Sequence, residues 1–387
     1  MELYIAGGCS EHGRNSFLVR KGDLTLLVDA GKMKEHPERP WPELTDEQIR
    51  SIDYLFLTHS HADHTGALPH LLERGFRGTV VAAAATLREL PVQAARTETL
   101  EHLGKPGEEI RVAKKLHVMW GRSGHCIGSV WYRFRMGKKT ILFTGDYEEH
   151  SCAYRCDRIR GISADVAVVD CAYGFEREDA REHRRTLEEA LDALAARGKP
   201  MLFPVPSHGR GFDVIRLLAE RGVPIILAES LEREYGESKD ADFWLKKGFR
   251  KAVRDAETVG IGTFEAAFRR TFMRRGSFPR DYMRYGILVR DSQLVKNENR
   301  QVALGAFERG GTTVLTGKQD PQSFARKLLD GGKAEFCRIS VHQNAGEMIR
   351  LIGKNQFTRV VPYHCREVLS FDSPDISVLS AGDRIRF

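Results

Sequence analysis

Short apolar runs that end in Gly, Asp or His dominate the first part of the chain. Runs of this length, bounded by turn-forming residues, are typical of buried β-strands. The wider spacing of apolar positions in residues 69–74, 88–97 and 186–197 predicts helices. Alternating strands and helices indicate an α/β fold with polar, reactive side chains at the carboxyl ends of the strands. The predicted strands cover residues 24–29, 54–58, 79–83, 130–135, 140–144 and 166–170.

The pattern changes between about residue 180 and residue 335. Strands alternate with helices there, long basic helical segments follow, and strands then return. After about residue 336, strand-like runs end in histidine, as in the first part of the chain. We therefore predict a discontinuous first domain, residues 1–177 and 336–387, interrupted by an inserted domain, residues 178–335. The elements predicted inside the insertion are strands at 200–205, 224–228, 286–289 and 312–316 and a helix at 212–220.

The composition is that of a globular protein. The chain has 387 residues, of which 41% are hydrophobic, enough for one large or two smaller folded units. No apolar stretch approaches the roughly 18 residues that a transmembrane helix needs, and the start of the sequence lacks the pattern of a secretory signal. Seven scattered cysteines indicate reduced thiols and not a disulfide framework. We therefore expect a cytoplasmic protein that does not associate with membranes.

Positive charge is concentrated in one part of the sequence. The formal net charge is +7, and residues 244–290 hold twelve Lys and Arg against four Asp and Glu. A basic stretch suits a polyanionic partner because phosphate contacts dominate the affinity of proteins for nucleic acids. Taken alone, such a stretch is more often a solvated helical surface. The charge therefore supports a nucleic-acid substrate without establishing one.

The clearest chemical signal is the sequence THSHADH, which directly follows a predicted strand. It places His59, His61, Asp63 and His64 on one short loop, where their side chains can converge. Imidazole nitrogens and carboxylate oxygens are the ligands that zinc takes in catalytic sites. Polar residues on an ordinary surface loop would rarely show this spacing, so the loop predicts a metal site.

Three further residues extend the candidate ligand set. His125 lies in the glycine-flanked turn GHCIGSV, Asp146 follows the apolar run of FTGDY, and His364 ends the strand-like VVPYHC. Each of them alone would be interpreted as a capping residue or a hydrogen-bonded core residue. Together with the histidine loop, they predict a larger metal centre.

These features resemble the metallo-β-lactamase superfamily, which also matches at LLVDAG, residues 26–31. The resemblance implies an αββα sandwich that binds two metal ions. Asp146 would bridge both ions, and Asp29 would orient a ligand without binding metal itself. The remaining matched residues form two ligand groups: His59, His61 and His125 for one ion, and Asp63, His64 and His364 for the other.

Two neighbouring cations favour hydrolysis as the reaction. Cations about 3.5–4 Å apart can share a water molecule, lower its pKa towards about 7 and neutralise the charge that develops on phosphorus. A structural zinc site would be closed by four ligands and would have no use for the larger set found here. We expect two Zn²⁺ ions, with Mn²⁺ as the alternative, because histidine and carboxylate ligands accept both metals.

Later motifs indicate one branch of the superfamily. VVDCAYG places Asp170 at a strand end, and ISVHQNAGEM places His342 ahead of a predicted helix. With His364, these residues resemble motifs A, B and C of the β-CASP nucleases, although the usual Ser-Ala-His of motif B is Ser-Val-His here. Residues 203–218 and 314–320 resemble segments of the β-CASP domain. The resemblance thus implies an inserted β-CASP α/β domain within a discontinuous sandwich.

The same resemblance implies the roles of individual residues. His342 would contact the scissile phosphate or protonate the leaving oxygen, and Asp170 would hold His342 in place. Asp63 would act in catalysis as well as in metal binding. Arg210 and His208, at a Gly-Arg turn before a predicted helix, would bind phosphate oxygens. Since a histidine at motif C goes with RNA-acting members, we expect a metal-activated hydroxide to cleave RNA, preferably single-stranded.

Three alternatives remain open at this point. A β-CASP DNA nuclease would share the chemistry but act on the other polymer. A small-molecule hydrolase of the same fold would have no evident use for the large insertion or the basic stretch. A catalytically inactive binding module would have lost metal ligands, whereas every matched ligand position is intact. A homodimer, the direction of cleavage and the endo- or exonucleolytic mode are also left open.

Overall fold

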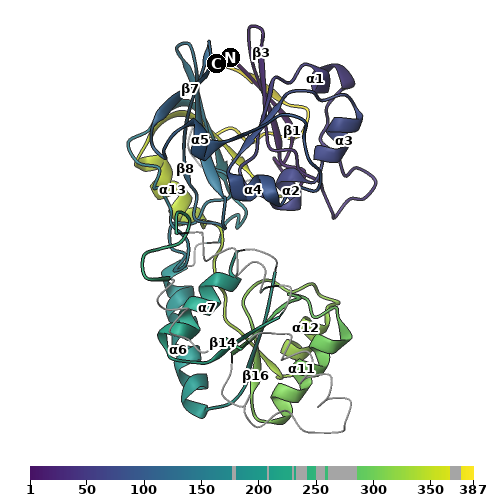
Figure 1. The fold of residues 1–387 in the computed structure, drawn as a ribbon, viewed down its shortest axis with the longest axis vertical. Coiled ribbons are helices and arrows are strands. Elements are labelled where there is room, and N and C mark those ends of the chain that lie inside the picture. The colour runs from purple at the N-terminus through teal and green to yellow at the C-terminus, as the bar shows by residue number, and fades with distance from the viewer. Residues whose placement is uncertain are drawn as a thin grey trace. The chain divides into compact units, whose positions relative to one another are not determined.

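The computed structural model describes residues 1–176, 180–206, 209–228, 231, 242–249, 258–259, 286–366 and 376–387. The chain forms two compact units, which are drawn in Figure 1. The first consists of Met1–Glu149, Cys156–Arg177 and His342–Phe387, and the second of His150–Arg155 and Glu178–Val341. His208 lies outside the described residues, as do most of the basic stretch at 244–290 and its expected helical segments.

One sheet of the first unit contains seven strands in the order β19-β1-β2-β3-β4-β5-β6. Its strands β3, β4 and β5 are parallel neighbours. Helices α1 (Asp46–Arg50) and α3 (Leu68–Glu73) cover one face, where Ile49 and Leu71 join the same core as Leu27 and Leu55. The strands are β1 (Glu2–Gly7), β2 (Ser16–Lys21), β3 (Leu24–Val28), β4 (Tyr54–Phe56), β5 (Thr79–Ala82), β6 (Thr97–Thr99) and β19 (Arg384–Arg386).

The second sheet of this unit contains six strands in the order β18-β11-β10-β9-β8-β7. Strands β10, β11 and β18 are parallel neighbours, so their carboxyl ends meet at one edge. Helix α13 (Ala345–Gly353) covers one face and buries Met348 and Leu351 in the core that contains Ala167 and Val169. The strands are β7 (Glu109–Ala113), β8 (Leu116–Arg122), β9 (Val130–Met136), β10 (Lys139–Phe143), β11 (Ser163–Asp170) and β18 (Gln356–Tyr363).

Aromatic side chains join the two sheets. Phe56 of β4 contacts Tyr132 and Phe134 of β9 edge to face, with ring centroids 5.5 and 4.8 Å apart. Phe17 of β2 lies 5.6 Å from Phe143 of β10. Such pairs contribute about 0.5–1.5 kcal/mol each beyond the area they bury. Helices outside and two sheets inside make the predicted αββα sandwich, which the structure confirms.

The second unit is built on one fully parallel sheet in the order β14-β13-β15-β12-β16-β17. Helices lie on both sides of this sheet, α6 and α7 on one and α11 and α12 on the other (Figure 1). Of these, α7, α11 and α12 supply crossover connections between its parallel strands. The strands are β12 (Met201–Val205), β13 (Ile225–Leu227), β14 (Thr258–Val259), β15 (Gly286–Arg290), β16 (Thr312–Leu315) and β17 (Ala334–Phe336), and the helices α6 (Ala180–Arg197), α7 (Gly211–Glu220), α11 (Asn297–Glu308) and α12 (Phe324–Asp330).

The helix predicted for residues 88–97 was wrong. The structure has a short helix α4 (Ala84–Arg88) that ends where the predicted one begins, and β6 starts at Thr97. Pro91 explains the difference, because a proline disfavours helical backbone in the residue before it and removes a helical hydrogen bond. Two more short helices, α2 (Ala62–Thr65) and α5 (Leu100–Leu103), complete the first unit. Within the described ranges, no helix has the length and apolarity to cross a membrane.

Candidate metal centre

The predicted site residues of the first unit gather at the carboxyl ends of its parallel strands. Asp29 directly follows β3, and the histidine loop follows β4. Asp146 follows β10, Asp170 is the last residue of β11, and His364 directly follows β18. Because neighbouring parallel strands end at the same edge, residues from distant parts of the sequence become neighbours in space.

Backbone contacts hold the histidine loop in a tight turn. His61 is the N-cap residue of helix α2, which contains Asp63 and His64. The carbonyl of His64 accepts the N–H of Ala30 at 2.7 Å, and the carbonyl of Asp63 accepts the N–H of Asn15 at 3.0 Å. Gly31 permits this approach, since a Cβ atom on it would lie 1.8 Å from the Asp63 carbonyl oxygen. The loop is therefore fixed to the strand ends around it.

The first ligand group, His59, His61 and His125, surrounds one oxygen of Asp146. Nε2 of His59 and Nε2 of His125 each lie 3.5 Å from Asp146 Oδ2. Nε2 of His125 is 3.2 Å from Nδ1 of His61. One potential ligand atom from each of these four residues lies within 4.8 Å of those of the others.

The second ligand group, Asp63, His64 and His364, surrounds the other oxygen of Asp146. Nε2 of His64 lies 3.2 Å and Nδ1 of His364 lies 3.4 Å from Asp146 Oδ1. Nε2 of His364 is 3.3 Å from Asp63 Oδ2. The carboxylate of Asp146 thus presents one oxygen to each group, which is the arrangement that a bridging ligand requires.

Asp29 lies behind His64 and accepts hydrogen bonds with both oxygens. Oδ1 accepts the N–H of Thr58 at 2.7 Å, and Oδ2 lies 2.8 Å from Nδ1 of His64. This contact directs Nε2 of His64 towards Asp146. Asp29 and His364 have φ angles of 60° and 68°, a left-handed backbone that residues with a side chain rarely adopt. Such conformations occur where surrounding contacts impose them, and they are frequent at functional sites.

His342 and Asp170 lie beside the two ligand groups. Nδ1 of His342 is 2.9 Å from Oδ2 of Asp170, a completely buried carboxylate. Asp146, Asp170, His342 and His364 also form a cluster whose potential ligand atoms are within 4.8 Å of one another. The structure therefore brings both predicted catalytic residues to the predicted metal centre.

Three residues at this centre were missed at the sequence level. The hydroxyl of Tyr363 donates to Asp146 Oδ1 at 3.1 Å, and Nε2 of Gln343 donates to the carbonyl of Asp170 at 2.8 Å. Nδ2 of Asn15 lies 2.9 Å from Nε2 of His64. Tyr363 and Gln343 directly follow or precede a predicted site residue in the chain, and this adjacency was the available signal. Asn15 carried none, because its contact depends on the tertiary fold.

The electrostatics of the centre favour a bound cation. Burial alone would raise the pKa of Asp146, but the imidazoles of His64 and His364 hold it well below its usual range. Burial also opposes a charge on His364, yet Asp146 and Asp63 together raise the pKa of His364 to about 10. Protons on the imidazoles thus balance the carboxylates. Bound metal cations would balance the negative charge of these carboxylates in the same way.

Buried nitrogen atoms provide a second test of whether a metal fits. Nε2 of His59 and Nδ1 of His364 are buried and have no hydrogen-bond partner among the described residues. Leaving such an atom unpaired costs about 1–3 kcal/mol, so it needs a ligand that the protein chain does not provide. Burial lowers the pKa of His59 well below its usual value and keeps the ring neutral, the form that binds metal. The donor set fits divalent metal ions.

Arg210 lies in the second unit, at the start of helix α7. Its Nη1 donates to the carbonyl of Thr316 at 2.9 Å. Gly317 makes room for the guanidinium, because a Cβ atom there would lie 1.8 Å from Nη1. The turn that contains Arg210 and the segment 314–320, which contains Thr316 and Gly317, are therefore neighbours within this unit.

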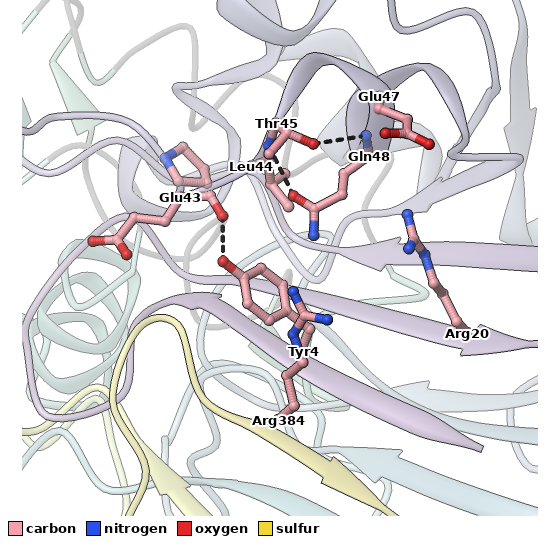
Figure 2. Close-up of a pocket in the computed structure, with 9 residues that line it drawn as sticks. Tyr4, Arg20, Glu43, Leu44, Thr45, Glu47, Gln48 and Arg384 are labelled. Atoms are coloured by element: carbon pink, nitrogen blue, oxygen red, sulfur yellow. Dashed lines mark hydrogen bonds between the residues drawn. The ribbon is translucent and has the colours of Figure 1, made fainter.

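A cavity of about 560 Å³ lies elsewhere in the first unit (Figure 2). Tyr4, Arg20 and Arg384 line it together with the residues around the start of α1. Figure 2 shows the Tyr4 hydroxyl directed to the carbonyl of Glu43, a hydrogen bond of 2.7 Å. None of its lining residues belongs to the predicted site, so this cavity is separate from the candidate metal centre.

Two curated proteins are similar in sequence to this chain. Endoribonuclease ysh1 of Aspergillus fumigatus is 25% identical, over 94% of this chain and 47% of its own length. Transcription termination factor FttA of Lokiarchaeum sp. is 25% identical, over 57% of this chain and 39% of its own length. The chain therefore spans about half or less of the length of these relatives.

A solved structure and a family model also match the chain. A protein of unknown function from Enterococcus faecalis V583 aligns with a TM-score of 0.61 and 14% identity, over 99% of both chains, and this likeness concerns the fold alone. The model of the metallo-beta-lactamase superfamily matches residues 10–206, about half of the chain. The match includes the histidine loop, His125 and Asp146. The chain belongs to the metallo-beta-lactamase superfamily.

Proposed function

We propose that this protein is a two-metal phosphodiesterase of the β-CASP type that cleaves RNA. One observation carries the proposal: Asp146 directs one carboxylate oxygen to each of two groups of ligand side chains. A single structural ion would need only one such group. We propose two Zn²⁺ ions for these positions, the first held by His59, His61 and His125 and the second by Asp63, His64 and His364, with Asp146 between them.

The metal pair would supply a nucleophile at neutral pH and positive charge at the phosphate. The protein side chains supply the geometry. Asp29 holds His64 through Nδ1, and Tyr363 holds Asp146 through Oδ1. Fixed ligands of this kind require no rearrangement when the substrate arrives, which favours the transition state over the ground state.

His342 is the residue that we propose assists the leaving group. Its Nδ1 is bound to Asp170, so Nε2 is the atom that can hold a proton for the leaving oxygen. Asp170 keeps the ring in one orientation, with Nδ1 engaged. An alkoxide is a poor leaving group, and a proton delivered by a positioned acid contributes roughly 10²–10⁴-fold to the rate of such steps.

RNA is the substrate that the relatives favour, because one of them is named an endoribonuclease and another a transcription termination factor. The net charge of +7 also suits a polyanion. We further propose that the second unit is the β-CASP domain, that Arg210 contacts phosphate and that the substrate is single-stranded. The seven free cysteines support a reducing compartment such as the cytoplasm.

The experiment that tests this function compares matched substrates. RNA and DNA oligonucleotides of the same sequence, labelled at the 5′ or the 3′ end, are incubated with the metal-loaded protein. We expect cleavage of RNA that stops when a chelator removes the metal, and the product ends will report the direction. Efficient cleavage of DNA without cleavage of RNA would replace this proposal with the DNA nuclease alternative.

A further inference from the structure

A cavity of about 280 Å³ lies in the first unit beside the candidate metal centre. The cavity is lined by Ser10, Glu11, His12, Met33, His36, Arg39 and Arg366. The ring of His12 contacts that of His364 edge to face, with centroids 5.5 Å apart. The side chain of His12, which lines the cavity, thus contacts His364, a proposed metal ligand.

The walls of this cavity are held in place by the fold. Arg14 is buried, and its guanidinium donates to both carboxylate oxygens of Glu11 at 2.7 and 2.8 Å. On the other wall, Met33 is buried and its N–H donates to the carbonyl of Pro40 at 2.9 Å. Walls that are ordered in advance lose little entropy when a ligand binds.

The cavity offers positive charge to a ligand. Glu11 is the carboxylate in its lining, and both of its oxygens already accept from Arg14. Arg39 is exposed and forms no salt bridge with another described residue, and the carboxylate of Glu38 interacts with it electrostatically. Arg366 pairs with Glu35, but both side chains are about half exposed, at 51% and 52%. Such a surface pair contributes only about 0–1 kcal/mol, so a phosphate can compete for the guanidinium.

We propose that this cavity is a nucleotide subsite, which holds the ribonucleotide next to the scissile phosphate. Its size is near the lower end of small-ligand pockets, roughly 300–1,000 Å³, and suits one mononucleotide. The guanidinium groups of Arg39 and Arg366 bind the phosphate, because their planar forks match phosphate oxygens. His12 separates the subsite from His364 and so sets the distance between the bound nucleotide and the metals. This inference rests on the proposed function.

The test is the affinity of the full chain for a fluorescein-labelled RNA hexamer. Fluorescence anisotropy with a chelator present measures binding without cleavage, and KM with added Zn²⁺ measures it during turnover. We expect the double variant Arg39→Ala/Arg366→Ala to weaken binding and to raise KM by about tenfold. The slope of log Kd against log salt concentration should fall by about one to two, because one or two phosphates are no longer neutralised. An affinity within twofold of that of the unsubstituted protein would overturn the subsite.

A matched control separates local from general charge effects. Arg50 is exposed on α1 and lies 4.0 Å from Asp46, and Arg50→Ala should leave the affinity unchanged. An equal loss in this control would also overturn the subsite. If the metal-loaded protein cleaves no RNA while the double variant loses affinity as expected, the proposed function fails, and the cavity binds a nucleotide without a role in cleavage. If cleavage occurs and the double variant binds normally, only the subsite fails.

Discussion

Nδ1 of His342 lies 2.9 Å from Oδ2 of Asp170, and the carboxylate is completely buried. The same oxygen accepts the N–H of Tyr147 at 2.9 Å, and Oδ1 accepts the N–H of Ala172 at 3.0 Å. Because backbone donors fix both oxygens, the carboxylate cannot turn away from the imidazole. The ring is thus held with Nδ1 engaged and Nε2 available.

Asp170→Asn should lower kcat by about 10²–10⁴-fold, the usual contribution of a positioned acid or base. The amide keeps the shape of the side chain but lacks the carboxylate charge that Nδ1 of His342 contacts. Single-turnover kinetics on labelled RNA measure the effect, and the metal content should stay the same. His342→Ala should cost a similar factor, and the double variant little more, because the two residues act as a unit. Additive losses would show that Asp170 acts separately from His342.

His61→Ala removes one side chain of the first ligand group and should abolish turnover. The loop should keep its fold, because backbone hydrogen bonds such as that from Ala30 to His64 hold it. Metal analysis should find about one ion fewer per chain than in the unsubstituted protein. Asp63→Ala should do the same to the second group. Full activity of either variant would contradict the two-metal assignment.

Tyr363→Phe removes the hydroxyl that donates to Asp146 and leaves the ring that packs against Phe17. Loss of such a contact behind a ligand typically weakens metal binding or activity about 10–100-fold. Competition with a chelating dye measures the affinity. Tyr4→Phe is the matched control, since its hydroxyl donates to the carbonyl of Glu43 outside the centre. An unchanged metal affinity in Tyr363→Phe would show that Asp146 needs no support from this hydroxyl.

Gly31→Ala should disrupt the metal centre without touching a ligand. Its Cβ would lie 1.8 Å from the carbonyl oxygen of Asp63 and 2.5 Å from the N atom of Asn15, so the histidine loop must move. Metal content and activity should both fall. Gly353→Ala is the control, because its Cβ would meet nothing within 4 Å. Normal metal binding by Gly31→Ala would mean that the loop tolerates displacement.

The clustering of the candidate ligands could be predicted from the sequence because most of them lie at strand ends. Apolar runs predict the strands, and the residue after each run falls at the sheet edge where parallel strands meet. The HxHxDH loop needs no tertiary information, since its members lie within one turn of chain. His364 ends a strand-like run, and only the other candidate ligands and the superfamily resemblance distinguish it from a core histidine.

Contacts that depend on the tertiary fold could not be predicted in this way. Asn15 and Tyr363 meet the centre only after strands from both ends of the chain pair. The cavity beside His12 depends on the path of the loop at residues 33–39, which no periodic pattern specifies. The helix predicted at 88–97 was wrong for a different reason, because the apolar spacing was given more weight than Pro91. Local backbone restriction overrides periodicity at such a position.

The pair of ions around Asp146 is tested most directly by a crystal structure of the zinc-loaded protein, with anomalous scattering recorded at the zinc edge. Two peaks about 3.5–4 Å apart are expected, one beside each carboxylate oxygen of Asp146. A single peak, or peaks that avoid both ligand groups, would contradict the two-metal centre and the proposed hydrolysis of RNA with it.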